Sequence, residues 1–391
     1  MSAAALPPAS TPSHTPRTPW PRAIGLALAA SAVVVVVLLA FLWPTITSSV
    51  KDVPLAIAGS SQQVAQVAKT LDAEGSGTFA VTGVASRDKA VELIRARDVY
   101  GAIVLGDRPE VLTASANGAA VSQILGQIAG RLQAQANTHA AAAVQQAVAG
   151  GELPAGTAPP AIEVTVTDVV PLASTDARGL GLTAASFPLV LGGMVGGILI
   201  SLLVAGVWRR LMSVTVYGLA GGFAVVGIMQ GWFGVLQGDF WINGLAVSLA
   251  MFATAAFIVG MSAVLGRVGI AVGAIVTILI GNPLSSAAQP LQFTVAPWGA
   301  IGQWFVPGAS GTLVRDLSYF PDANATFAWL VLAGWAMVGV IAMFAGHFRD
   351  QVLVRAAGHE AERAGDRGAA EGAGEPAGEP AGESGRVTQP V

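Results

Sequence analysis

Hydrophobic stretches of the chain are separated by polar segments of very different length. The first stretch runs from Ala23 to Trp43 and contains the uninterrupted apolar run Val33–Leu39. About 140 mostly polar residues follow, and five further stretches are then closely spaced. These five lie near residues 187–207, 212–233, 243–265, 268–282 and 326–346. Because about 20 apolar residues in a helix cross a bilayer, the pattern predicts a polytopic α-helical membrane protein with six transmembrane helices.

The long polar segment, residues 44–186, has the periodicities of a mixed α/β domain inserted between helices 1 and 2. Ser86 is placed to cap a helix in which Ala90, Val91 and Ile94 share a face. Strands are expected at 53–58, 78–84, 101–105, 110–114 and 163–170, and helices at 62–71, after Ser86, and across 118–149. The order β-α-β-α-β-β-α-β predicts a small sheet covered by helices, with a proline-rich linker at 153–160.

Composition supports a membrane protein: 53% of residues are hydrophobic and 11% are charged, against about 25% charged in a typical globular domain. A net charge of −3 gives no indication of nucleic-acid binding. With no cysteine, disulfides, thiolate catalysis and Cys-ligated zinc are excluded. Residues 1–22 and 347–391 are rich in Pro, Ser, Gly, Glu and Ala, which predicts disordered ends on either side of helix 1 (23–43) and a five-helix unit (187–346).

Arginines indicate the orientation. They cluster before helix 1, between helices 2 and 3, between helices 4 and 5, and after helix 6: Arg17, Arg22, Arg209, Arg210, Arg267, Arg349 and Arg355. With six spans all of these fall on one side, so the positive-inside rule places both termini in the cytoplasm and residues 44–186 outside. The length of helix 1 and its exit at Trp43-Pro44 favour a membrane anchor over a cleaved signal peptide.

No catalytic constellation is recognisable. The chain has no G-x-x-x-x-G-K-[ST] motif, no lysine after Lys89 and no H-E-x-x-H motif, and its four histidines are scattered. We therefore expect no enzyme activity, no cofactor and no metal site. The predicted spans also carry almost no ionisable residues, which disfavours a proton- or sodium-coupled carrier.

Two segments of the membrane region are candidate functional elements. In helix 2 the small-xxx-small pairs predict close helix packing, either within the protomer or across a dimer seam; they are Gly192/Gly196 and Gly193/Gly197. The loop 283–325 is apolar, aromatic and broken by proline, which favours a hairpin of half-helices at the outer interface over a plain loop with a tryptophan belt. Its diagnostic residues are Pro283, Pro297, Trp298, Trp304 and Pro307.

This layout resembles the ABC-2-type transporter permeases, and more closely their phage-infection-protein-like branch. The similarity covers about residues 20–350 and is carried by short segments at corresponding places. These are the strand Val53–Ala58 after helix 1, the helix Val91–Arg95, the strand Tyr100–Leu105, the domain end Asp168–Leu172 and the helix start Phe187–Gly193.

The resemblance implies a bacterial plasma-membrane protein that acts as the permease-like subunit of an exporter. It further implies a homodimer or heterodimer in the lipid bilayer, powered by a P-loop ATPase on a separate chain. That ATPase would dock near Trp208, Arg209 and Arg210 and near Arg267. The alternative is a non-transporting scaffold, receptor or secretion accessory protein that displays the extracytoplasmic domain.

Overall fold

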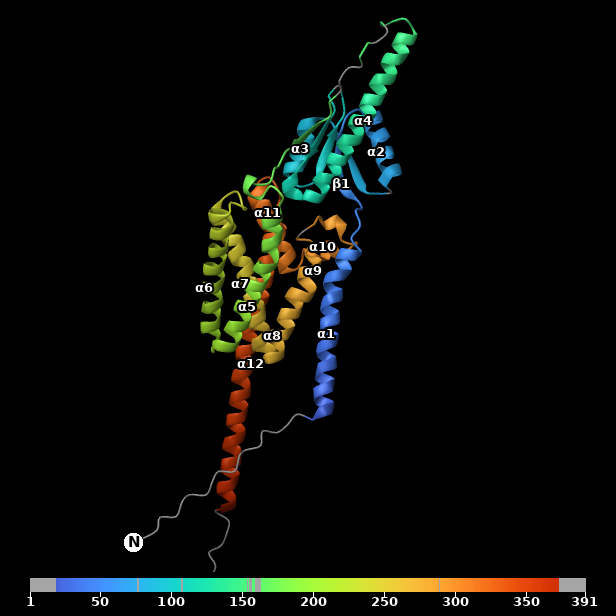
Figure 1. Cartoon of the computed structure of the whole chain (residues 1–391). Coiled ribbons are helices and arrows are strands. Elements are labelled where there is room, and N and C mark those ends of the chain that lie inside the picture. The colour runs from blue at the N-terminus through green and yellow to red at the C-terminus, as the bar shows by residue number, and fades with distance from the viewer. Residues whose placement is uncertain are drawn as a thin grey trace, which may run out of the picture.

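The computed structural model describes residues 19–372, apart from 76, 107, 153, 155–156, 159–162 and 288. A small sheet domain lies at one end of an elongated helical bundle (Figure 1). Residues 1–18 and 373–391, where most of the predicted N-terminal disorder and the Gly/Glu/Pro-rich repeat fall, are outside the described residues.

The sheet domain has five strands in the spatial order β2-β1-β3-β4-β5. β1 is parallel to β2 and β3, whereas β4 is antiparallel to β3 and parallel to β5. The predicted alternation of strands and helices is confirmed along the chain. Its elements are β1 (Val53–Ala58), α2 (Ser61–Gly75), β2 (Phe79–Val84), α3 (Arg87–Arg95), β3 (Gly101–Val104), β4 (Glu110–Thr113), the short helix η1 (Ser115–Asn117), α4 (Ala119–Ala149) and β5 (Thr165–Asp168).

Helices cover both faces of this sheet, and for that reason β1 and β3 are almost entirely apolar. On one face, α3 buries Ala90 and Ile94 against the strands. Its first turn is capped as predicted, because the Ser86 hydroxyl accepts a hydrogen bond from the Lys89 backbone N–H at 3.2 Å. On the other face, α2 and α4 pack over Leu55 and Ile103.

The bundle contains the apolar helices. Among the described residues, five helices are long and apolar enough to cross a membrane: Trp20–Pro44, Val207–Trp232, Phe240–Leu265, Arg267–Leu284 and Thr326–Arg349. The remaining predicted span, 187–207, overlaps α5 (Leu180–Leu203), whose described apolar stretch, Leu189–Leu203, is shorter. The bundle elements are α1 (Trp20–Ile46), the short η2 (Ser174–Asp176), α5 (Leu180–Leu203), α6 (Val207–Val226), the π-helical turn η3 (Gly227–Trp232), α7 (Phe240–Leu265), α8 (Arg267–Ala274), the π-helical η4 (Ile275–Gly281), α9 (Asn282–Leu284), η5 (Leu291–Phe293), α10 (Trp298–Gly302), α11 (Val306–Tyr319) and α12 (Thr326–Gly372).

α7 is the central helix of the bundle, and 72% of its most apolar stretch is buried. The neighbouring helices approach it through glycines, where a Cβ atom would strike its backbone or side chains. The contacts come from Gly193 and Gly197 of α5, Gly218 and Gly222 of α6, Gly273 of α8, and Gly339 and Gly346 of α12. Small residues at helix crossings permit this close approach.

The C-terminal helix is longer than the sequence analysis expected. Disorder was predicted from residue 347, whereas α12 continues to Gly372 and projects beyond the end of the bundle opposite the sheet domain (Figure 1). The segment 347–372 is rich in Ala, Arg and Glu, which are strong helix formers. The Pro-containing repeat that gave the tail its disordered appearance begins only after Gly372.

The crossing of α7 and α12 provides a stability test. A Cβ atom at Gly339 would overlap the backbone of Ala256, whereas one at Gly334 on the same helix would meet nothing within 4 Å. We expect Gly339→Ala to destabilise the protein by about 1–3 kcal/mol through overpacking. Gly334→Ala, the matched control, is expected to be neutral or stabilising because alanine has the higher helix propensity. Thermal unfolding of both purified variants in detergent measures this, and equal midpoints would contradict the packing described.

Candidate functional site at the domain junction

The sheet domain is joined to the bundle by a continuous hydrophobic cluster. The cluster begins at α3 and the sheet with residues such as Ile94 and Ala116, and continues into the bundle through Leu236, Val314 and Phe320. Phe320, just after α11, is only 1% exposed. Because buried residues of both parts belong to one cluster, the two parts form one packed unit.

A largely buried ion pair lies at the junction. Arg97, in the turn after α3, donates from Nη1 to Oδ1 of Asp316 on α11. The side chains of Arg97 and Asp316 are 16% and 5% exposed. Arg97 also donates from Nε to Oδ1 of Asn117 at 3.0 Å, and its guanidinium lies 5.4 Å from the centre of the Phe320 ring. The charge is thereby hydrogen-bonded and stacked on an aromatic face.

The backbone at Arg97 is unusual. Its φ of 62° places it in the left-handed region, at the position after a helix end where glycine is the common choice. A non-glycine residue there stores strain of about 1–3 kcal/mol unless its surroundings favour it. The contacts of the Arg97 side chain with Asp316, Asn117 and Phe320 offset this backbone strain. Arg97 therefore helps to hold the sheet domain in place on the bundle.

A second arginine, Arg315, lies next to this pair. Its Nη2 donates to the Ala287 carbonyl at 3.2 Å, and its Nε is buried with no hydrogen-bond partner. Burial lowers the pKa of Arg315 to about 10, so the guanidinium remains charged at neutral pH. Burial also raises the pKa of the Tyr100 and Tyr319 hydroxyls, so neither supplies a negative charge.

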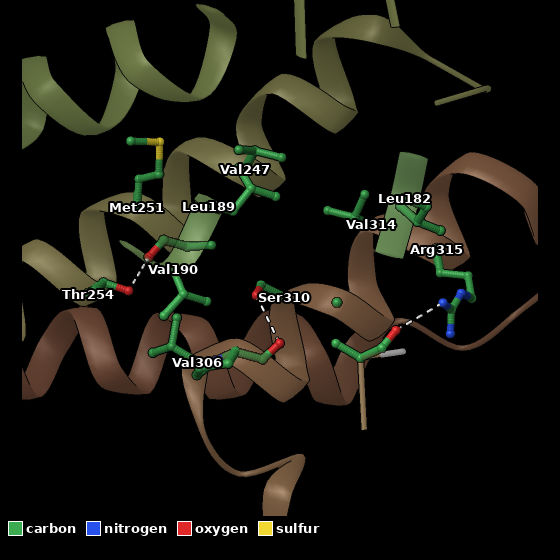
Figure 2. Close-up of a pocket in the computed structure, with 14 residues that line it drawn as sticks. Leu182, Leu189, Val190, Val247, Met251, Thr254, Val306, Ser310, Val314 and Arg315 are labelled. Carbon is green, nitrogen blue, oxygen red and sulfur yellow. Dashed lines mark hydrogen bonds between the residues drawn. The ribbon is translucent and has the colours of Figure 1, made fainter. Parts of the chain in front are cut away.

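Arg315 closes one end of a cavity between α5, α7 and α11. The cavity holds about 40 Å³. Figure 2 shows Arg315 and Leu182 at one end and Met251 and Thr254 at the other. Apart from Arg315, the lining is apolar or carries only the hydroxyls of Thr254 and Ser310, which donate to the carbonyls of Ala250 and Pro307.

A larger hollow of about 580 Å³ lies in the sheet domain between α2 and α4. Its floor is apolar, with Val67, Leu71 and Ile103, and its rim carries glutamines and Arg131. Within the described ranges, no three His, Asp or Glu side chains gather as a metal site.

The residues predicted to contact an ATPase separate into two groups. Arg210 donates from Nε and Nη2 to the carbonyls of Val204 and Ser201, at 2.8 and 3.2 Å, and so caps the C-terminal end of α5. Trp208 packs edge-on against Phe344, with 5.3 Å between the ring centres, but is 70% exposed. Arg209 and Arg267 are also exposed.

The predicted outer hairpin corresponds to α9 through α11. Trp298 and Trp304 are 47% and 62% exposed, and the Trp304 carbonyl accepts a hydrogen bond from Trp335 Nε1 at 2.7 Å. Pro283 lies in α9 and Pro297 directly precedes α10. The second limb enters the bundle, because α11, which includes Pro307, packs against α7 and α12 with Leu313 fully buried.

The predicted packing glycines of α5 face other helices of the same chain. Gly193 and Gly197 lie against Thr254 and Ala255 of α7, and Gly196 lies under the ring of Tyr217. The Tyr217 hydroxyl donates to the Gly192 carbonyl, whereas a Cβ atom at Gly192 would make only one loose contact, 3.9 Å from Met251 Cε.

Sequence reasoning missed the junction itself. Arg97, Arg315 and Asp316 are absent from the candidate residues that the sequence indicated. One local feature of the sequence points to the junction. Arg97 occupies the position after a helix end, where glycine is usual. Comparisons of the chain with protein-family models, with curated proteins and with solved structures found no match.

The charge arrangement predicts unequal effects of removing either partner of the ion pair. Asp316→Asn leaves the partly buried Arg97 and Arg315 without a counter-charge, and we expect a loss of about 3 kcal/mol in the free energy of unfolding. Arg97→Gln leaves Asp316 beside Arg315 with balanced charges, so its cost should be smaller. Glu92→Gln, which breaks the exposed pair with Lys89, is the control and should cost less than about 1 kcal/mol. Denaturant unfolding in detergent measures all three, and an Arg97→Gln cost above that of Asp316→Asn would contradict this description of the charges.

Proposed function

We propose that the chain is the permease-like subunit of an ABC-2-type exporter, with six spans, both termini in the bacterial cytoplasm and the sheet domain outside. A separate P-loop ATPase supplies the energy, and the sheet domain caps or extends the exit path. The assembly is a homodimer or heterodimer in the bilayer.

The observation that carries this proposal is the distribution of charge on the helices. Between their ends, the five long apolar helices contain no Asp, Glu, Lys or Arg, so these helices lack the carboxylates that ion-coupled carriers use. The carboxylate of Asp316, on α11, is paired with Arg97. The arginines instead gather at the starts of α6 and α8 and late in α12, at the end opposite the sheet domain (Figure 1).

Two of those arginines are available to a partner. Arg210 and Arg349 donate to carbonyls at the ends of α5 and α7, whereas Arg209 and Arg267 project from the same end with exposed side chains. Exposed arginines on short turns suit an acidic docking surface, because electrostatic complementarity directs such contacts.

The alternative is a scaffold, receptor or accessory protein in which the bundle only anchors the sheet domain. The junction disfavours this reading. A domain that needs only a tether has no use for a buried Arg97–Asp316 pair or for a hydrophobic cluster shared with α11. Both are expected when the domain must follow movements of the bundle.

Site-specific photo-crosslinking in native membranes tests the proposal. A crosslinking side chain at position 209 or 267 should capture a P-loop ATPase, identified by mass spectrometry. The same side chain at exposed Arg108 in the sheet domain is the control and should not. We also expect Arg209→Gln with Arg267→Gln to reduce ATPase recovery severalfold without lowering the amount of folded protein.

Efficient crosslinking that yields no ATPase at either position would overturn the exporter proposal. Full function of the sheet domain tethered by residues 1–46 alone would favour the anchoring alternative.

A further inference from the structure

Arg315 has no carboxylate of its own at the junction. The charged groups that act on it are Arg97 and Asp316, and the ionisable groups beside it are Tyr100 and Tyr319. A further buried carboxylate, Asp176, lies near Tyr319 and accepts hydrogen bonds from the Gly181 and Leu182 backbone N–H groups. Asp316 is already bonded to Arg97. The charge of Arg315 is therefore uncompensated among the described residues that surround it.

Arg315 also has hydrogen-bonding capacity to spare. A guanidinium has five N–H donors in a fixed planar fork. The Ala287 carbonyl takes one of them, and the Nε–H is buried with no acceptor. A buried charge is costly unless it is both paired and hydrogen-bonded, so two independent deficits, one of charge and one of acceptors, fall on the same side chain.

The adjoining cavity provides room for a group that would supply both. One water needs roughly 10–15 Å³ of such space, and the cavity of about 40 Å³ exceeds that. Among the described residues, Arg315 is the one charged residue that lines it (Figure 2). The other lining side chains are apolar except for Thr254 and Ser310, whose hydroxyls donate to backbone carbonyls.

We propose that this cavity is an anion site in which Arg315 binds the oxygens of a phosphate group. The planar fork matches oxyanion geometry and can donate two parallel hydrogen bonds. The phosphate comes either from free inorganic phosphate or from the headgroup of an anionic lipid whose apolar part lies along the bundle. The site does not depend on the proposed export function.

The experiment measures the thermal unfolding midpoint of the purified full-length protein. One arm titrates inorganic phosphate into delipidated protein in detergent, with sodium chloride keeping the ionic strength constant. The other compares nanodiscs of phosphatidylcholine with and without phosphatidylglycerol. Because a ligand that binds only the folded state stabilises it, we expect the midpoint to rise by about 5 °C at saturation in at least one arm.

Variants assign the effect to Arg315. Arg315→Gln should abolish the rise, while Arg108→Gln, the same change at an exposed position of the sheet domain, should retain it. Arg315→Lys keeps the charge without the planar fork and should show a smaller rise, which covers the case in which Arg315→Gln does not fold.

Each outcome has a definite meaning. A rise with inorganic phosphate identifies a site that accepts the free anion, and a rise with phosphatidylglycerol alone identifies a lipid-headgroup site. No rise in either arm would overturn the proposal, as would a full rise in Arg315→Gln or a rise in Arg315→Lys equal to that of the unchanged protein.

Discussion

The close approach of helices to α7 is the constraint on which the rest of the bundle depends. Inside a bilayer the hydrophobic effect does not drive helices together, so van der Waals contact at short distance has to do so. Gly197 of α5, Gly218 and Gly222 of α6 and Gly339 of α12 provide that contact on different sides of α7. With α7 so enclosed, α11 can enter the bundle beside it and bury Leu313. The position of α11 in turn places Asp316 and Phe320 in contact with Arg97 of the sheet domain.

The junction connects the sheet domain to α11 through direct side-chain contacts. Arg97 reaches from the sheet domain to Asp316, and Phe320 lies beneath its guanidinium. Interdomain surfaces are often polar and mobile, but this one is buried and shares a hydrophobic cluster with the bundle. A change in the position of α11 would therefore be transmitted to the sheet domain. The anion proposed at Arg315 would occupy the same helix, so its binding would stabilise the packed arrangement.

The two ends of the bundle differ chemically, and the proposed permease function rests on that difference. At the sheet-domain end, Arg97 and Asp316 are paired within the junction, and the exposed loop charges are of mixed sign: Arg178, Asp239 and Asp322. At the opposite end, arginines cap neighbouring helices or stand exposed, as Arg210 and Arg209 illustrate. Cations near helix C-termini are favourable because they complement the helix dipole. Orientation in the membrane and the surface offered to a cytoplasmic partner would thus share one set of residues.

The sequence by itself determined the local elements. Alternation and helical periodicity predicted β1, β3, α3 and its Ser86 cap, and the length of the apolar stretches predicted the bundle helices, because these depend on neighbours within a few residues. Only the tertiary structure decided that Arg97 meets Asp316, 219 positions away, that α11 lies inside the bundle, and that Arg315 borders a cavity without a counter-charge. Those contacts depend on how the helices cross in space. Residues so far apart along the chain produce no periodic sequence pattern from which their contact could be predicted. The extension of α12 to Gly372 was missed for a different reason: the glycines and charges of its last turns have the composition of a disordered tail, while their alanines and arginines favour a helix.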